Sequence, residues 1–429
     1  MRRWREQRGE RRSVRFSVRP TPRGWQAIII GALVLVVARV IGTTQFHQLG
    51  YALLVLPVAS FVLGYLASRG IGFSRSLPPG ERLSAGKTAR INVLLSNDSR
   101  LDTSRLEITD RLPDAREIQT TPLRSGGGTA VEVPVSFARR GVYELGPAEV
   151  RMTDPFGLLR FARRFVRKTE VVVYPEVHDL AGFPLSGGNV EAGSRGARGQ
   201  RGDEFAGLRE YRRGDDQRHI HWKSVARTGE LFVKEFALEA PRRYTVALDL
   251  RRSGIRAVEA EIEDAVSAAA SVLTHLKMER LPARLLCNDR TVGTTEFASD
   301  EAAYWRAMRI LATVRADGEA LLSETVTEER ASLGEGAVLI SRTRDESLAG
   351  CVRKLRGAGL SVVVVMLAAH TYRGFPTGHS GGREAERESE FQREVGRLEA
   401  AGAAVRVMRR QDGVARLASG RRRERGAVS

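Results

Sequence analysis

Two long apolar runs near the start of the chain constrain its fold more than any other feature. They are Trp25–Ile41, of 17 residues, and Leu49–Leu66, of 18 residues, and only the stretch GTTQFHQ separates them. Runs of this length approach those of membrane-spanning helices, so the short connection predicts a transmembrane hairpin over residues 25–66. The alternatives are a pair of buried soluble helices and a cleaved signal peptide. The second apolar run, which follows at once, disfavours a cleaved signal peptide.

The arginines around the two runs predict the orientation of this hairpin. Nine Arg lie among residues 1–24, none lies between the runs, and Arg69, Arg75 and Arg82 follow the second run. The positive-inside rule then places both termini and the folded domains in the cytoplasm, with the protein in the inner (cytoplasmic) membrane. Arg39 lies near the outer end of the first run, where a long side chain can reach the headgroups.

Charge is concentrated at the two ends of the chain. The formal net charge is +18, of which residues 1–24 carry +7 and residues 406–425 carry +6. We expect a basic cytoplasmic N-terminus over 1–24 and a basic disordered tail over 409–429 that contacts anionic lipid and is dispensable for folding. Because the body between them is nearly neutral, nucleic-acid binding is the weakest functional hypothesis. Cys287 and Cys351 are too far apart for a metal or redox motif, and we expect both to be reduced core residues.

The middle of the chain has the period of β-strands. Apolar residues alternate or run together over residues 91–95, 106–109, 131–137 and 171–174, with turn residues between them. We predict a small β-sandwich-like domain over 80–176, with a structural or interaction role. Residues 177–203 are rich in glycine and predict a linker or loop, and no GxxxxGK[ST] motif supports a phosphate site there.

Residues 204–240 interleave charged and apolar side chains. The stretch 202–239 has seven basic and eight acidic residues, a balance that favours an ion-pair network over a phosphate track. Two enzyme hypotheses remain open as alternatives. His219 and His221, with Asp215 or Asp216, form a candidate divalent-metal site, and Ser224 with His221 and Asp215 forms a candidate nucleophile triad.

This stretch also resembles a known family. REYRRGDDQRHIHWKSVART at 209–228, with RGVYELGP at 140–147, TDPFGL at 153–158 and VVYP at 172–175, is similar to the bacterial family known as domain of unknown function 58. We predict a partner-facing motif in which Arg218, Trp222 and Arg227 hold together a partly buried ion network, and no catalytic residue. The motif residues are Arg209, Tyr211, Gly214, Asp215, Arg218, Trp222, Lys223 and Arg227.

Residues 241–408 alternate strands with helices. Strands are expected at 243–250, 283–287, 337–341, 360–367 and 403–408, and helices at 262–276, 299–315, 344–358 and 385–401. This pattern predicts a doubly wound, mostly parallel sheet. Asp249 and Ser253 resemble the metal site of von Willebrand factor A-type domains, but Arg251 stands where that pattern has Ser. The resemblance therefore implies a von Willebrand factor A-like domain with a degraded site, free of metal and of other cofactors.

The resemblance also guides the functional hypothesis. Members of the family are often encoded beside MoxR-type AAA+ ATPases. This implies a non-enzymatic membrane scaffold or adaptor that works with such an ATPase and other membrane proteins in assembling or maturing an envelope-associated complex. The principal alternative is a hydrolase or metal-dependent enzyme that uses the motif at 209–228.

Overall fold

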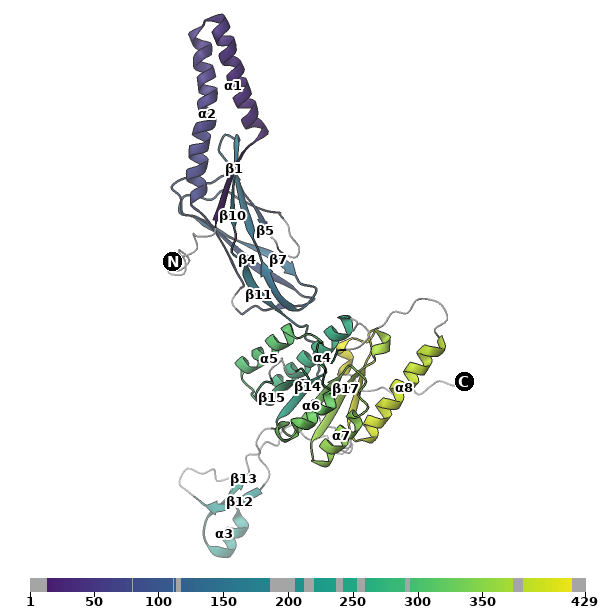
Figure 1. Ribbon diagram of the computed structural model, residues 1–429. Helices are drawn as coiled ribbons and strands as arrows, with labels where there is room; N and C mark the ends of the chain where they lie inside the picture. The colour runs from purple at the N-terminus through teal and green to yellow at the C-terminus, as the bar shows by residue number, and fades with distance from the viewer. Residues whose placement is uncertain are drawn as a thin grey trace, which may run out of the picture. The chain divides into compact units, whose positions relative to one another are not determined.

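The computed structural model divides the chain into two units, Met1–Glu176 and Val177–Ser429, which are described separately. Figure 1 shows the elements of each unit along the chain. The structure describes residues 14–78, 80–110, 112, 117–185, 205–211, 220–236, 242–252, 259–289, 294–372 and 381–418.

The two apolar runs form a helical hairpin. Helix α1 spans Pro22–Ile41 and helix α2 spans Thr44–Arg69, and both are long and apolar enough to cross a membrane. The buried residues of α1 are all small and are spaced by seven, Gly24, Gly31 and Ala38. Gly31 lies against Leu53 and Leu54 of α2, whereas Gly24 lies against Leu158. Small residues such as Gly31 let two helix backbones approach closely, as in helix pairs within membranes. The predicted pair of apolar helices is confirmed, and its length and composition indicate a membrane anchor.

The connection between the helices is shorter than predicted. Only Gly42 and Thr43 separate them, and the polar residues that follow begin α2. Gly42 adopts a left-handed conformation, with φ of 78°, and its N–H bonds the carbonyl of Ala38. One glycine at the C-cap is sufficient to end α1, so the polar stretch is free to continue as helix.

The rest of the first unit is built from strands that share one core. The strands form a five-stranded sheet β1-β10-β9-β5-β6 and two three-stranded sheets, β3-β11-β8 and β2-β4-β7. Alternate residues such as Val93, Ile108 and Phe161 are buried in the common core. The sheet-rich character predicted for this region is confirmed. The strands are β1 (Val14–Pro20), β2 (Ile71–Ser76), β3 (Leu83–Ser84), β4 (Thr88–Asn97), β5 (Leu106–Asp110), β6 (Glu117–Thr120), β7 (Gly128–Ser136), β8 (Gly141–Leu145), β9 (Ala148–Thr153), β10 (Leu159–Phe165) and β11 (Thr169–Tyr174).

Strands lead directly into and out of the hairpin. Strand β1 precedes α1 and pairs antiparallel with β10, from Val14 opposite Phe165 to Pro20 opposite Leu159, and β2 follows α2. Residues 14–20 of the predicted basic N-terminus over 1–24 therefore also belong to the sheet. The apolar residues of β1 alternate with Arg and Ser as in a strand, a pattern that the arginine content concealed.

The second unit contains a doubly wound sheet, as predicted. Its order is β15-β14-β16-β17-β18, and every neighbouring pair is parallel. Strands β14 and β16 are buried along their whole length, as expected for strands covered by helices on both faces. The elements are β14 (Tyr244–Leu248), α4 (Glu259–Met278), β15 (Ala283–Cys287), α5 (Glu301–Thr313), α6 (Leu322–Glu328), β16 (Gly336–Ser341), α7 (Leu348–Gly357), β17 (Ser361–Leu367), α8 (Gly381–Ala400) and β18 (Ala404–Met408).

Residues after β18 pack on this unit, so the predicted disordered tail is wrong for residues 409–418. Val414 and Leu417 lie in a short 3-10 helix, η6 (Val414–Leu417), and are only 2% and 1% exposed. Arg409 donates two hydrogen bonds to Glu388 of α8, at 2.9 and 2.5 Å. Two apolar residues three positions apart are enough to dock one helical turn, although arginines surround them. Residues 419–429 lie outside the described part.

The Arg409–Glu388 pair gives a testable dependence on pH. Hydrogen bonds from Arg409 lower the pKa of Glu388 from 4.5 to about 2. A lowered carboxyl pKa contributes stability that is present above the unfolded pKa and is lost as the pH falls through the folded one. We expect Glu388→Gln to lower the unfolding free energy by about 1 to 2 kcal/mol at neutral pH, allowing for solvent screening. In urea unfolding, this difference should shrink between about pH 5 and pH 2. A loss independent of pH would contradict the assignment.

Candidate functional site

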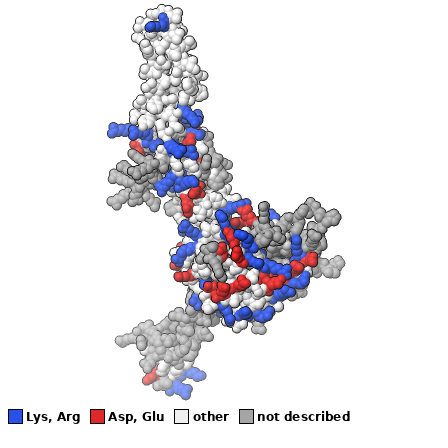
Figure 2. Space-filling model, viewed as in Figure 1, with Lys and Arg blue, Asp and Glu red and all other residues white. Residues whose placement is uncertain are grey.

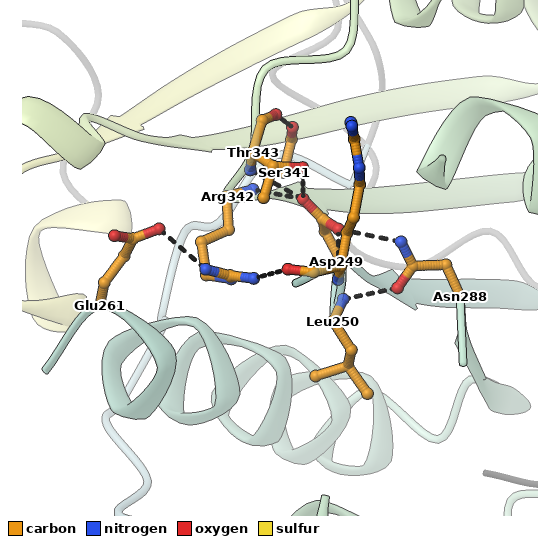
Figure 3. Close-up of polar contacts among 8 residues, drawn as sticks. Asp249, Leu250, Glu261, Asn288, Ser341, Arg342 and Thr343 are labelled. Atoms are coloured by element: carbon orange, nitrogen blue, oxygen red, sulfur yellow. Dashed lines mark hydrogen bonds and ion pairs between the residues drawn. The ribbon is translucent and has the colours of Figure 1, made fainter. Parts of the chain in front are cut away.

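The carboxyl edge of the parallel sheet contains a dense polar cluster. From β14 the chain crosses to β15 on one side, and β16 lies on the other. Doubly wound sheets bind ligands at such a switch point, outside the carboxyl ends of the strands. Asp249 follows β14, Asn288 follows β15, and Ser341, Arg342 and Thr343 lie at the end of β16 (Figure 3). Parallel pairing of these strands brings the side chains together.

The carboxylate of Asp249 is 1% exposed and accepts five hydrogen bonds. Its Oδ1 accepts from the backbone N–H of Arg251 at 3.0 Å and from Asn288 Nδ2 at 2.9 Å. Its Oδ2 accepts from the backbone N–H groups of Arg342 and Thr343, at 3.2 and 2.7 Å, and from Thr343 Oγ1 at 2.6 Å. A carboxylate offers about four lone-pair directions, so donors of the protein fill its acceptor capacity. These hydrogen bonds connect the carboxyl ends of β14, β15 and β16.

A buried ion pair lies beside this carboxylate. Arg342 Nη1 lies 3.1 Å from Glu261 Oε1 of α4, and the two side chains are 0% and 1% exposed. Arg342 Nη2 also donates to the backbone carbonyl of Arg251 (Figure 3). Asn288 also contacts the loop after β14, because its Oδ1 accepts a hydrogen bond from the Leu250 N–H at 2.5 Å. The guanidinium is therefore held between α4 and the loop that follows β14.

The structure places part of the predicted metal site. Asp249 lies in the cluster, whereas Ser253 lies outside the described residues. The Arg251 side chain donates to the carbonyl of Arg344, at 3.3 Å, and only the backbone N–H of Arg251 bonds the Asp249 carboxylate. Within the described residues, no group of three His, Cys, Asp or Glu is placed to hold a metal ion. The prediction of a metal-free site remains a prediction.

Sequence reasoning missed Arg342, Glu261 and Asn288. The signal for Arg342 was the Arg-Thr-Arg-Asp stretch directly after a buried strand, a position where a charged side chain is unusual. Glu261 lies on the apolar face of α4, where a carboxylate indicates a buried partner. The partner itself cannot be read from sequence, because 81 positions separate the two residues.

A second candidate site is the motif segment. Strand β12 (Phe205–Glu210) pairs antiparallel with β13 (Phe232–Phe236), and the short helix α3 (Trp222–Thr228) lies between them in the chain. Backbone bonds from Tyr211 to Leu231 and from His221 to Phe232, each 2.8 Å, hold this arrangement. Ile220 and Val233 form its buried bridge, at 7% and 5% exposed. The segment is thus a strand pair that carries a helical turn.

The structure places five of the eight predicted motif residues. Arg209 lies on β12 opposite Val233, Tyr211 follows it and is half-buried, and Trp222, Lys223 and Arg227 lie on α3 and are exposed. Gly214, Asp215 and Arg218 lie outside the described part, as do His219 and Asp216 of the metal hypothesis.

Trp222 is 65% exposed, so its ring does not pack against a core. The ion network that it was predicted to hold together includes Arg218, which lies outside the described residues, so that role stays a prediction. Ile220 and Val233 supply the buried apolar contact instead. Arg227 makes no ion pair with any described residue. We conclude that α3 offers an aromatic ring and two cations to solvent, an arrangement that suits contact with another molecule.

The exposure of Trp222 predicts that its replacement has little effect on stability. Trp222→Ala should change the unfolding free energy of the β12–β13 pair by less than about 0.5 kcal/mol, as for most surface substitutions. Ile220→Ala should lower it by about 2 to 5 kcal/mol because a buried side chain is removed. Hydrogen exchange of the β13 amides measures both effects. Equal losses in the two variants would show that Trp222 is packed.

The structure brings together two members of the predicted triad. His221 Nδ1 lies 2.7 Å from Ser224 Oγ, and Ser224 is partly buried. The pair spans three positions at the start of α3, so local helix geometry is sufficient to produce the contact. Asp215, the third member, lies outside the described residues.

Comparison with known proteins gives a family match over part of the chain. Residues 207–290 match the family described as Protein of unknown function DUF58. This chain carries a DUF58 segment. The DUF58 match contains α3 of the motif and also Asp249 and Asn288 of the polar cluster, whereas Arg342 lies beyond it. No curated protein gives a significant match.

Solved structures give only weak likenesses. β-Glucosidase 3B from Thermotoga neapolitana is 16% identical with a TM-score of 0.11, over 24% of this chain and 16% of that chain. A β-glucosidase from Paenibacillus barengoltzii is 12% identical with a TM-score of 0.11, over 68% of this chain and 39% of that chain. Such scores carry no argument about fold or activity.

Proposed function

We propose that this protein is a membrane-anchored, non-enzymatic scaffold or adaptor. It works with a MoxR-type AAA+ ATPase in assembling or maturing a complex associated with the cell envelope. The observation that carries the proposal is the closed switch point of the parallel sheet. Five protein donors surround the Asp249 carboxylate, and Arg342 beside it is paired with Glu261. Polar groups that satisfy one another in this way favour a role in contacting a partner protein.

The von Willebrand factor A-like character of the second unit belongs to this proposal. Residues beyond β15 support it, because Ala298 bridges Ala283 in the antiparallel direction and Thr295 N–H bonds the Leu285 carbonyl at 3.1 Å. Counted as an edge strand, this segment extends the order to 3-2-1-4-5-6, with one antiparallel edge on a parallel sheet. The switch point stays between β14 and β16.

The proposed topology places both termini and both folded units in the cytoplasm. The excess of Arg before α1, compared with none between residues 42 and 48, supports it. An impermeant thiol reagent applied to intact cells should label Gln45→Cys, in the first turn of α2. The same reagent should leave Ser332→Cys, in the second unit, unlabelled until the cells are opened. Labelling of Ser332→Cys in intact cells would reverse the topology and remove a cytosolic ATPase as partner.

A hydrolase remains the second candidate because of the contact between His221 and Ser224. The two functions predict different effects of single substitutions on cellular function. For an adaptor, Ser224→Ala and His221→Ala should each leave cellular function within about twofold, since both are local surface changes. For a hydrolase that uses this pair, either substitution should lower turnover by orders of magnitude while folding is kept. Complementation of a deletion strain, with expression matched by immunoblot, separates the two.

A further inference from the structure

The turn between β9 and β10 is built to present one aromatic side chain. The buried carboxylate of Asp154 accepts from the backbone N–H groups of Phe156, at 2.8 Å, and Leu159, and the Asp154 carbonyl accepts from the Gly157 N–H at 3.0 Å. Asp first, Pro second and Gly last, with φ of 73° at Gly157, are the residues that such a turn favours. Phe156 lies at its tip, is 47% exposed, and belongs to the TDPFGL stretch.

This turn is fixed to the start of helix α1. Thr21, the N-cap of α1, donates its N–H to the Leu158 carbonyl at 2.8 Å and its hydroxyl to the Gly157 carbonyl at 2.7 Å. A Cβ on Gly24 would lie 2.2 Å from the Leu158 oxygen, so helix and turn are in direct backbone contact. The position of Phe156 along the axis of α1 is therefore fixed relative to the first turn of that helix.

The length of α1 then determines where Phe156 lies relative to a bilayer. Helix α1 has 20 residues, about 30 Å at 1.5 Å per residue, and the hydrocarbon core is about 30 Å thick. An α1 that spans the core has its first turn at the near interface, with Trp25 exposed there. Phe156 consequently lies at the same interface, beside the lipid headgroups.

Uncompensated positive charge surrounds this position. Arg19 lies directly opposite Arg160 in the pairing of β1 with β10, and Arg23 lies in the first turn of α1. All three are exposed, and none forms an ion pair with another residue that the structure describes. Like charges placed opposite each other on paired strands destabilise a sheet. Figure 2 shows Lys and Arg gathered where the hairpin meets the strands.

We propose that Phe156, Arg19, Arg23 and Arg160 form a binding surface for anionic phospholipid headgroups. It rests on the proposed membrane anchor and adds a second contact, made by the β-strand unit itself. Anionic phosphates relieve the repulsion between Arg19 and Arg160, and the aromatic ring enters the interface, where such rings are favoured. The strand unit is then held at the leaflet by its β9–β10 turn, which restricts its swinging on the helices.

The depth of Phe156 is the first test. Cys287 and Cys351 are buried, and burial raises the pKa of the Cys287 thiol to about 12, so an environment-sensitive thiol fluorophore can be directed to single introduced cysteines. We expect bromolipids in phosphatidylglycerol-containing nanodiscs to quench the full-length protein labelled at Phe156→Cys, and at Val55→Cys in α2. Label at Ala138→Cys, an exposed position just after β7 and near the start of β4, should stay unquenched.

The outcomes separate this inference from the membrane anchor. Quenching at Val55→Cys without quenching at Phe156→Cys would overturn the lipid surface and leave the anchor intact. Absence of quenching at both positions would overturn both.

The arginines are tested by lipid binding. Full-length protein in neutral detergent is titrated with phosphatidylglycerol, and the bound lipid is counted by native mass spectrometry. Arg19→Gln, Arg23→Gln and Arg160→Gln should each weaken binding about fivefold, the equivalent of about 1 kcal/mol per basic residue. The matched change of Lys87, Arg90 and Arg139 to Gln, at the start of β4 and just after β7, should not. Equal losses in both sets, or displacement of the lipid by inorganic phosphate at physiological concentration, would overturn the proposal.

Discussion

Arg342→Met is expected to lower the unfolding free energy of the second unit by about 3 to 5 kcal/mol. The substitution leaves Glu261, which is 1% exposed, buried without its counter-ion, and it removes the donor to the Arg251 carbonyl. The cost of an unpaired buried charge exceeds the gain from the added apolar side chain. Urea unfolding of the fragment 177–429, which forms a compact unit, gives the value.

Two further variants make this result specific. The double variant Arg342→Met with Glu261→Leu should recover most of the loss, because apolar replacement of a whole buried pair is often neutral or stabilising. Arg344→Met should cost less than about 1 kcal/mol, since Arg344 is 63% exposed and pairs with Glu346 at the surface. A wild-type stability for Arg342→Met alone would mean that Arg342 is not needed to close the switch point.

Truncation after Met408 is expected to lower the unfolding free energy of the same fragment by about 3 to 6 kcal/mol. It removes the buried side chains of Val414 and Leu417, each contributing about 1.5 to 3 kcal/mol, and the Arg409–Glu388 hydrogen bonds. Truncation after Ala418 is the matched control, because it removes only the Arg-rich residues 419–429. That shorter truncation should leave stability unchanged. Equal stability of the two truncated fragments would support the original prediction of a disordered tail that begins at residue 409.

The sequence predicted elements whose periodicity was strong. The two apolar helices and the Val-rich strand β17 appear where they were expected, because each has a long apolar pattern. The short strand 283–287 was also found, although it contains Arg284. Strand β1 and the docked turn η6 were missed. In both, a few apolar residues lie among arginines, and only a partner distant in sequence, β10 or α4, makes them part of a fold.

The candidate site was predictable only in part. Asp249 at the end of the first strand was found from its resemblance to the metal site of von Willebrand factor A-type domains. Its surroundings depend on Arg342 and Asn288, which come from other strands, and no local pattern connects them. Trp222 was predicted to hold together a partly buried ion network, but its ring is 65% exposed. Exposure of this kind follows from tertiary packing rather than from composition.

Co-purification from the native membrane tests the adaptor most directly. Full-length protein is captured from detergent-solubilised membranes, and co-purifying proteins are identified and quantified with and without added ATP. We predict a stoichiometric AAA+ ATPase that is lost in Trp222→Ala and retained in Met278→Ala, a change at a similarly exposed apolar residue, 71% exposed, on α4. If no ATPase co-purifies with wild type, and Ser224→Ala or His221→Ala abolishes cellular function, the account is contradicted and the hydrolase replaces it.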